Sequence, residues 1–360
     1  MAVELGLVGL ANSGKTALFN LLTGADGEVA AYAYTTREPM RGAADVPDPR
    51  LTAIADAQDI PRRVPAQVQI VDIAGLAAGA GRGEGLGGAA LGQLRETDAL
   101  VHVLRAFENA EVPHPLERVD PVADAEAVDL ELIAADAEQL ERRAERVAKA
   151  AKGGDAEAVA EAADLEAISA ALEDGRPARL AETESARARA SEMWLLSAKP
   201  MLYVANLDEP GPLPEGLEEH AAATEAQAFG LPVGIELELA GLDPEEAAEL
   251  ASELELGDTR GAPALVEASY RLLDLMTFFT GSAPPEARAW PIPRGTTADK
   301  AAGKIHTDME RGFIRAEVVS WDKLVAAGSF AKARETADVR MEGKDYIVQE
   351  GDVMQIRFNV

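Results

Sequence analysis

The chain has 360 residues, of which 47% are hydrophobic, and its formal net charge is −29. A charge of this sign excludes a basic footprint for nucleic acid over the whole surface, so DNA is not an expected partner. The absence of cysteine excludes disulfides, thiol catalysis and cysteine-ligated metal centres, and four histidines give little basis for a transition-metal site.

No apolar run approaches the ~20 residues that a membrane-spanning helix needs. The first residues, Met1 to Gly6, have neither the basic region nor the cleavage pattern of a signal peptide. We therefore expect a cytoplasmic protein that does not enter a membrane.

The negative charge lies before Thr280. Residues 280–360 contain twelve Lys or Arg and twelve Asp or Glu, which leaves 22 basic and 51 acidic residues for the preceding part. The last eighty residues are therefore the segment least repelled by a polyanion. A salt-rich or GC-rich host is an equally good explanation of the overall acidity.

In chain order, the first part of the sequence alternates strand and helix signals. Residues 3–10 form a short apolar run that ends in glycine, and residues 16–22 have helical spacing. Further short apolar runs follow at 68–72, 100–104 and 201–205. Strands that alternate with helices predict an α/β domain with a mostly parallel sheet.

Between about Asp120 and Trp194 the composition shifts to Ala, Glu and Arg. Apolar residues recur there at helical spacing in two runs, and Gly153 and Gly154 separate the runs. This pattern predicts an antiparallel helical hairpin inserted between two strands of the sheet. The alternative is a solvated charged arm without a packing partner.

The pattern changes again after residue 281. Residues 317–319, 346–348 and 353–358 are short strand-like runs with turn residues between them. We expect a small separate α+β domain, in which residues 340–358 form a hairpin that turns at Glu350 to Asp352.

The clearest chemical motif lies between the first strand and the first helix. Residues Gly9 to Thr16 read GLANSGKT, which matches the phosphate-binding loop G-x-x-x-x-G-K-[ST] in its required context. Backbone N–H groups of such a loop surround a phosphate, Lys15 reaches the β- and γ-phosphates, and Thr16 can bind Mg²⁺. The nucleotide-binding residues predicted here are Asn12, Ser13, Gly14, Lys15, Thr16 and Ala17.

Two further elements fit a triphosphate site. Asp72 ends an apolar strand, where an aspartate can hold Mg²⁺ through water, and Gly75 follows where its N–H can sense the γ-phosphate. Thr36 lies in a polar loop and can close over Mg²⁺ in the triphosphate state. Three elements in this order predict a P-loop nucleoside triphosphate hydrolase of the GTPase-like class.

The base-binding residues are less usual. GTPases carry N-K-x-D after the fourth strand, whereas this chain has Asn206, Leu207, Asp208 and Glu209. Because Glu209 is one methylene longer than aspartate, the paired hydrogen bonds to guanine should not form unchanged, and adenine becomes plausible. Asn206 could also serve only to tie loops together.

These motifs resemble those of the YchF, or Obg-like ATPase, family, and the resemblance covers essentially the whole chain. The segments that carry it are 9–16, 36–39, 46–51, 72–76, 83–87, 199–206, 277–280, 288–290, 301–306, 311–317 and 358–360.

The resemblance implies three domains: a G domain at 1–120 and 196–278, a helical coiled-coil insertion at 121–195, and a β-grasp TGS domain at 279–360. It also implies a monomeric, Mg²⁺-dependent ATPase that associates with the ribosome or ribosomal RNA in translation or stress regulation. The alternatives are a GTPase or non-selective hydrolase, or a binding module in which hydrolysis is incidental.

The resemblance further implies how water is activated. Leu76 stands where Ras-like GTPases place a glutamine, so another group must position the water. His114 matches a family histidine proposed for that task, although a histidine between two prolines can be an ordinary loop residue. Independently of this resemblance, an asparagine at the position of Asn12 occurs in GTPase families that recruit K⁺; the alternative is that Asn12 only caps the turn. In place of the usual hydroxyl residue, Ala17 offers only its backbone N–H.

Overall fold

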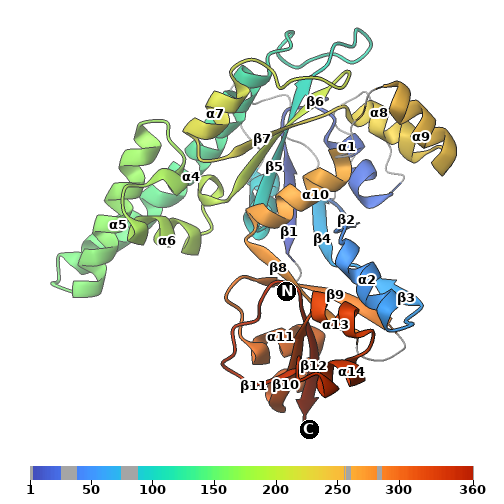
Figure 1. Cartoon of the computed structure of the whole chain (residues 1–360). Helices are drawn as coiled ribbons and strands as arrows, with labels where there is room; N and C mark the ends of the chain where they lie inside the picture. Colours follow the sequence, from blue (N-terminus) through green and yellow to red (C-terminus); the bar gives the residue numbers. More distant parts are fainter. Residues whose placement is uncertain are drawn as a thin grey trace. The chain divides into compact units, whose positions relative to one another are not determined.

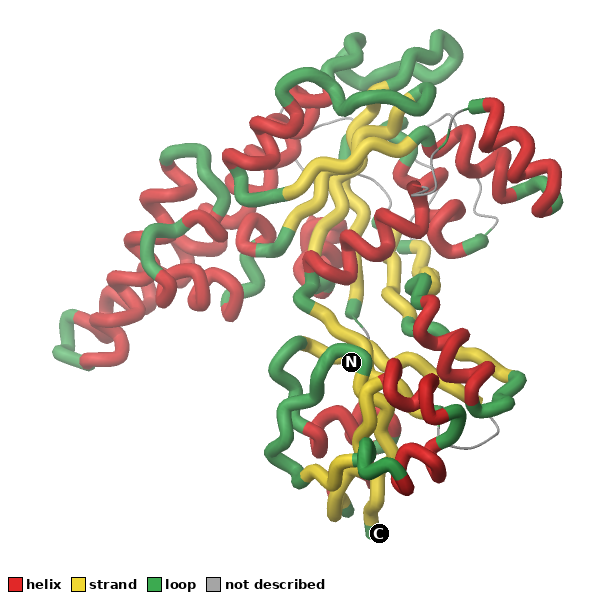
Figure 2. The backbone as a smooth tube through the Cα atoms, in the orientation of Figure 1, coloured by secondary structure: helices red, strands yellow, loops and turns green. Residues whose placement is uncertain are grey.

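The computed structural model describes residues 3–25, 39–73, 88–254, 256, 261–281 and 286–359 (Figures 1 and 2). The chain divides into two compact units, one formed by Met1–Ala44 with Gln69–Leu265 and the other by Asp45–Val68 with Val266–Val360. No described helix is both long and apolar enough to cross a membrane.

The first unit is built on a sheet with the strand order β2-β4-β1-β5-β6-β7. The pairs β1–β4, β1–β5, β5–β6 and β6–β7 are parallel, which confirms the predicted parallel sheet. Its strands are β1 (Glu4–Val8), β2 (Met40–Asp45), β4 (Gln67–Asp72), β5 (Ala99–Ala106), β6 (Met201–Leu207) and β7 (Gln227–Leu231).

Helices accompany this sheet along the chain. Residues of α3, α4 and α7 share one buried apolar cluster with the strands, which fixes the position of the first turns of α4 against the sheet. The helices of the unit outside the inserted hairpin are α1 (Lys15–Thr23), α3 (Gly88–Glu96), α7 (Leu217–Ala223), α8 (Val233–Ala240), α9 (Pro244–Glu253) and the first part of α10 (Gly261–Leu272).

The inserted helical hairpin is present as predicted and is called the arm below (Figure 1). The side chain of Asp120 caps its first helix by accepting a hydrogen bond from the N–H of Ala123, at 3.1 Å. Residues between the two long helices include Gly154, whose positive φ of 83° suits glycine. The arm consists of α4 (Pro121–Ala151), α5 (Ala156–Glu173), η1 (Ala178–Leu180), α6 (Glu184–Glu192) and η2 (Leu196–Ala198).

The helical spacing read from the sequence corresponds to a packed core in the arm. Leu140, Leu165, Ile168 and Leu172 are buried in one cluster. A buried carboxylate, Asp136, joins the arm to the segment that returns to the sheet, because it accepts hydrogen bonds from the backbone of η2 at 2.7 and 2.8 Å. The arm is therefore a packed element and not a solvated run of charge.

The second unit contains a mixed sheet with the strand order β11-β10-β12-β8-β9-β3. Helix α11 shares a buried cluster with its strands, an arrangement that fits the expected β-grasp module. The elements are α2 (Pro49–Ala57), β3 (Arg62–Val64), β8 (Leu275–Thr280), β9 (Glu286–Pro293), α11 (Ala298–Ile305), α12 (Thr307–Arg311), β10 (Phe313–Ser320), α13 (Trp321–Ala327), α14 (Phe330–Glu335), β11 (Arg340–Glu342) and β12 (Asp352–Phe358).

Two features of this unit differ from what the sequence pattern suggests. The expected hairpin at 340–358 is wrong, because β11 and β12 each pair antiparallel with β10 and not with each other. Glu350 instead accepts long-range hydrogen bonds from the N–H of Thr277. In addition, β3, which lies far upstream, pairs in parallel with β9, so the unit extends beyond residues 279–360. The predicted boundaries at 120, 195 and 278 remain predictions.

Candidate functional site

The phosphate-binding loop connects β1 to α1 and depends on two glycines. Gly9 has φ 146°, and a Cβ there would lie 2.3 Å from the carbonyl oxygen of Val103. Gly14 has φ 99°, and its Cβ would lie 2.2 Å from Nδ2 of Asn206. Both positions therefore require glycine for backbone conformation and for space, which is the reason that the motif places glycine there.

Lys15 begins α1 and points back into the loop. Its Nζ donates hydrogen bonds to the carbonyl oxygens of Gly9, at 3.0 Å, and Leu10, at 2.8 Å. Burial lowers the pKa of Lys15 to about 8, and the negative charge of Asp72 only partly opposes this shift. An ammonium group held in this way gains electrostatic stabilisation from an anion that approaches the loop, and a triphosphate is such an anion.

The neighbouring residues supply oxygen ligands. Thr16 donates its hydroxyl to Oδ2 of Asp72 at 2.7 Å, because the parallel pairing of β1 and β4 sets Leu7 opposite Asp72. A hydroxyl and a carboxylate are hard donors that suit Mg²⁺, which usually takes its remaining ligands from water and phosphate. With the remaining ligands taken from water and phosphate, these two oxygens fit a metal shared with a nucleotide. The described residues contain no group of three or more His, Cys, Asp or Glu that could hold a metal ion.

Asn206 lies at the end of β6 and is buried between two loops. Its Nδ2 donates to the carbonyl oxygen of Ser13 at 3.1 Å, and its Oδ1 accepts from the N–H of Val233 at 3.3 Å. The loop-tying role considered for Asn206 is thus real. Leu207 packs against the core of the sheet, and Glu209 is exposed just beyond the strand.

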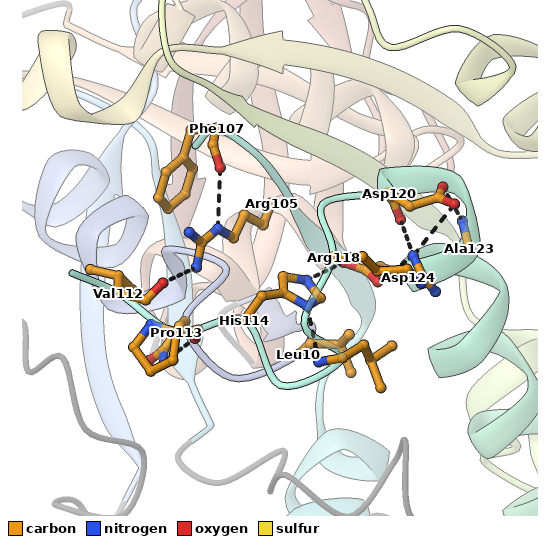
Figure 3. Close-up of polar contacts among 12 residues, drawn as sticks. Leu10, Arg105, Phe107, Val112, Pro113, His114, Arg118, Asp120, Ala123 and Asp124 are labelled. Atoms are coloured by element: carbon orange, nitrogen blue, oxygen red, sulfur yellow. Dashed lines mark hydrogen bonds and ion pairs between the residues drawn. The ribbon is translucent and has the colours of Figure 1, made fainter. Parts of the chain in front are cut away.

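A second loop contacts the phosphate-binding loop from the side. Nδ2 of Asn12, a residue in the left-handed conformation with φ 62°, donates to the carbonyl oxygen of Pro113 at 2.9 Å. Arg105, buried at the end of β5, holds this second loop by donating to the carbonyl oxygens of Phe107, Asn109 and Val112 at 2.8–3.2 Å (Figure 3).

Sequence reasoning missed the role of Arg105 in holding this loop. The only signal of Arg105 in the sequence is a cation near the end of a mostly apolar strand.

His114 is held on both sides of its ring (Figure 3). Nδ1 accepts the N–H of Leu116 at 3.0 Å, so the proton belongs on Nε2, which lies 2.8 Å from Oδ2 of Asp124. Burial raises the pKa of Asp124 above its ordinary value, although His114 and Arg118 oppose the shift. Asp124, in the first turn of α4, was not identified from the sequence, and it fixes the imidazole in this conformation.

Of the other predicted site residues, Ser13 has a buried hydroxyl with no hydrogen-bond partner among the described residues, a donor that a bound phosphate could use. Ala17 lies in the first turn of α1, where its backbone N–H belongs to the helix N-terminus. Thr36, Gly75 and Leu76 lie outside the described residues.

Two family models match the chain. One, described as "50S ribosome-binding GTPase", matches residues 4–149, and the other, described as "Protein of unknown function (DUF933)" and named for the C-terminal part of YchF GTPases, matches residues 275–359. The first match covers the phosphate-binding loop, Asp72 and His114, and the second covers the strands of the C-terminal sheet from β8 onward.

Curated relatives match over nearly all of this chain. The "Ribosome-binding ATPase YchF" of Bacillus subtilis is 43% identical, with 100% of both chains covered. "Obg-like ATPase 1" of Oryza sativa subsp. japonica is 36% identical over 99% of this chain and 92% of its own. A solved structure, that of the Schizosaccharomyces pombe YchF GTPase, aligns with a TM-score of 0.85 and 30% identity, covering 99% of this chain and 97% of the other.

The contact between Gly14 and Asn206 yields a prediction. We expect Gly14→Ala to weaken the binding of a non-hydrolysable nucleotide at least tenfold, because the added methyl group must displace the Asn206 amide. Calorimetric titration measures this. Gly24→Ala is the matched control: Gly24 also has positive φ, 65°, but open space around it, so this variant should lose about 1 kcal/mol of stability and keep its nucleotide affinity. Unchanged affinity in Gly14→Ala would contradict the assigned geometry.

The lowered pKa of Lys15 yields a second prediction. Below pH 8 the ammonium group is already charged, whereas above pH 8 the free protein must take up a proton before it attracts phosphate. If the bound triphosphate restores an ordinary pKa to Lys15, nucleotide affinity falls about tenfold between pH 7 and 9. Titrations in buffers of different ionisation enthalpy should show proton uptake near pH 8.5. Lys15→Arg serves as the control, since its charge does not titrate in this range, and a pH-independent affinity of the native protein would refute the assignment.

Proposed function

This chain belongs to the YchF family of P-loop nucleotide hydrolases, and we propose from that premise that it is a ribosome-associated, Mg²⁺-dependent nucleotide switch. In this proposal it hydrolyses ATP in preference to GTP, to ADP and phosphate, within translation or stress regulation in the cytoplasm. The single observation that supports this most strongly is the partly buried Lys15, whose ammonium group donates hydrogen bonds to two backbone carbonyl oxygens of a glycine-framed loop. Monomeric state stays a prediction.

The residues divide the chemistry between them. Lys15 and the N–H groups at the start of α1 bind and orient the phosphates, and they oppose the charge that develops on the β–γ bridge. Thr16 and Asp72 would hold Mg²⁺, which when bound neutralises phosphate charge and orients the γ-phosphate. Thr36 and Gly75 belong to the same proposal as the groups that respond to the γ-phosphate. A K⁺ ion beside Asn12 is a further element of the proposal.

Water activation is assigned to His114, with a condition set by the hydrogen bonds around it. In the described conformation neither ring nitrogen is free, since Nδ1 accepts the N–H of Leu116 and Nε2 is hydrogen-bonded to Asp124. His114 can take a proton from water only at Nδ1, after its loop moves so that the Leu116 N–H no longer occupies that nitrogen, whereas the hydrogen bond from Nε2 to Asp124 can persist and orient the ring. The link from Asn12 to Pro113 offers a way for the phosphate site to drive that movement.

Base selection is assigned to the segment from Asn206 to Glu209. Glu209 is exposed and free of hydrogen bonds to other described residues, so it can turn toward a base, but its length disfavours the paired contacts that guanine requires. The names of the relatives differ here, since the bacterial and plant proteins are called ATPases and the yeast structure a GTPase.

The base preference is tested by titrating the protein with non-hydrolysable ATP and GTP analogues in Mg²⁺, in parallel K⁺ and Na⁺ buffers. We expect the ATP analogue to bind at least tenfold more tightly, a difference of about 1.4 kcal/mol. In Glu209→Asp, which shortens the side chain, the preference should narrow. Equal or GTP-favoured binding by the native chain would make it a GTPase.

The role of His114 is tested by turnover. We expect His114→Ala to lower the hydrolysis rate several-fold and to leave the nucleotide affinity nearly intact, because the side chain acts on water and not on the nucleotide. Asp124→Asn is the companion variant, since it keeps an acceptor for Nε2 but removes the charge that holds the ring. If His114→Ala turns over at the native rate, His114 has no part in the reaction.

A further inference from the structure

A hollow of about 430 Å³ lies on the arm, among helices α4, α5 and α6. Four arginines and two glutamates line it, so its walls carry a formal charge of +2 in a chain whose total is −29. The charged lining residues are Arg142, Arg143, Arg146, Glu161, Arg189 and Glu192.

The spacing of the arginines on α4 explains how they meet. Gln139, Arg142, Arg143 and Arg146 occupy positions i, i+3, i+4 and i+7, which form one stripe along a helix. Arg142 and Arg146, stacked at i and i+4, repel each other, and neither forms a hydrogen bond or ion pair with another described residue. A helix that needed only internal packing gains nothing from this arrangement.

The remaining arginines are only partly satisfied by the glutamates. Arg143 uses its Nε for a 2.6 Å bond to Glu161 and makes no other described hydrogen bond. Arg189 bonds Glu192 at 2.7 Å through one terminal nitrogen. Its buried Nε has no hydrogen-bond partner among the described residues but forms an ion pair with Oδ2 of Asp164 at 3.7 Å. The guanidinium donors that remain free around the hollow are therefore chiefly those of Arg142 and Arg146, and their planar geometry suits a phosphate group.

An exposed aromatic ring lies next along the chain from Met193, another residue that lines the hollow. Trp194 is 55% exposed and adopts φ 57° directly after α6, a position where glycine is common. A bulky residue in this conformation is an outlier. Nζ of Lys199 lies 5.4 Å from the centroid of the Trp194 ring, so a base would stack on the other face. Gln139 anchors this turn to the hollow by donating to the carbonyl oxygen of Met193 at 2.6 Å.

We propose that this hollow binds the sugar–phosphate backbone of a single-stranded RNA segment, with Trp194 offering a ring on which a base can stack. Free arginines and an exposed aromatic ring are the combination that single-stranded RNA requires. The surrounding acidity restricts contact to the hollow, which favours one fixed docking point over general attraction. The inference rests on the proposed association with ribosomes and names the arm as the part that contacts RNA there.

The test is fluorescence anisotropy of the full-length chain with a labelled single-stranded RNA. We expect Arg142→Glu with Arg146→Glu to weaken binding at least tenfold and, from the loss of two phosphate contacts, to flatten the salt dependence by about 1.4 in log–log slope. The matched control is Lys152→Glu with Arg176→Glu, which changes the charge of the arm equally at two exposed positions that do not line the hollow and that lie off the arginine stripe. The control should keep native affinity. Thermal melting verifies that each variant is folded.

A second variant separates stacking from charge. Trp194→Ala should weaken RNA binding about fivefold or more without altering the salt slope, and Trp194→Phe should restore most of the loss. Both readouts are independent of nucleotide hydrolysis.

Several outcomes would overturn the inference. Equal loss in the hollow and control variants would mean that only total charge matters. The inference would also be overturned if tripolyphosphate failed to displace RNA from the hollow. It would be overturned as well if tripolyphosphate bound in the hollow and RNA did not. Co-sedimentation with ribosomes distinguishes the two proposals: if the native chain and the Arg142→Glu, Arg146→Glu variant sediment alike, the hollow is excluded and ribosome association stands. If the native chain neither sediments nor binds RNA, both fail.

Discussion

The amide of Asn206 is the contact on which the nucleotide site depends. One side chain at the end of β6 holds the carbonyl oxygen of Ser13 and the backbone N–H of Val233, so the phosphate-binding loop and the loop before α8 cannot move independently. The contact requires a glycine at position 14, because any side chain there would occupy the place of the amide. The phosphate-binding loop and the start of α8 are thus joined through one side chain.

Whether a part of the site is local in sequence explains which parts could be predicted. A phosphate-binding loop is a local structure whose glycines, lysine and threonine act within eight residues, so the motif alone identifies them. The parallel sheet followed from short apolar strands, and the hairpin of the arm followed from helical spacing. Asp72 could be placed beside Thr16 because consecutive strand ends meet at one edge of a parallel sheet.

The features that could not be predicted depend on contacts between residues that lie apart in the sequence. Nothing in residues 62–64 indicates that they pair with a strand more than two hundred residues later, since three residues carry no register. Arg105 and Asp124 act through backbone carbonyls and a ring nitrogen, which leave no motif. The hairpin predicted to turn at 350–352 is wrong for a similar reason. The side chains of Glu350 and Asp352 accept hydrogen bonds from Thr277 and Tyr346, and only their turn-forming composition suggested a hairpin. The arginine stripe of α4 is visible in the sequence, but the hollow it lines exists only once α5 and α6 pack against it.

The clasp between His114 and Asp124 has a mechanical consequence. Asp124 lies in the first turn of α4, and the helix continues for 31 residues in all, a length of about 46 Å at the usual rise per residue. The first turns of α4 are packed on the sheet, and Asp136 is bonded to the backbone of η2, so these turns rotate only together with that edge of the sheet. A rotation of about five degrees of this whole body would carry the far end of α4 through about 4 Å, given the helix rise per residue. A change at the phosphate-binding loop, passed on through Asn12 and Pro113, would in that way become a displacement at the end of the arm that a neighbouring macromolecule can detect.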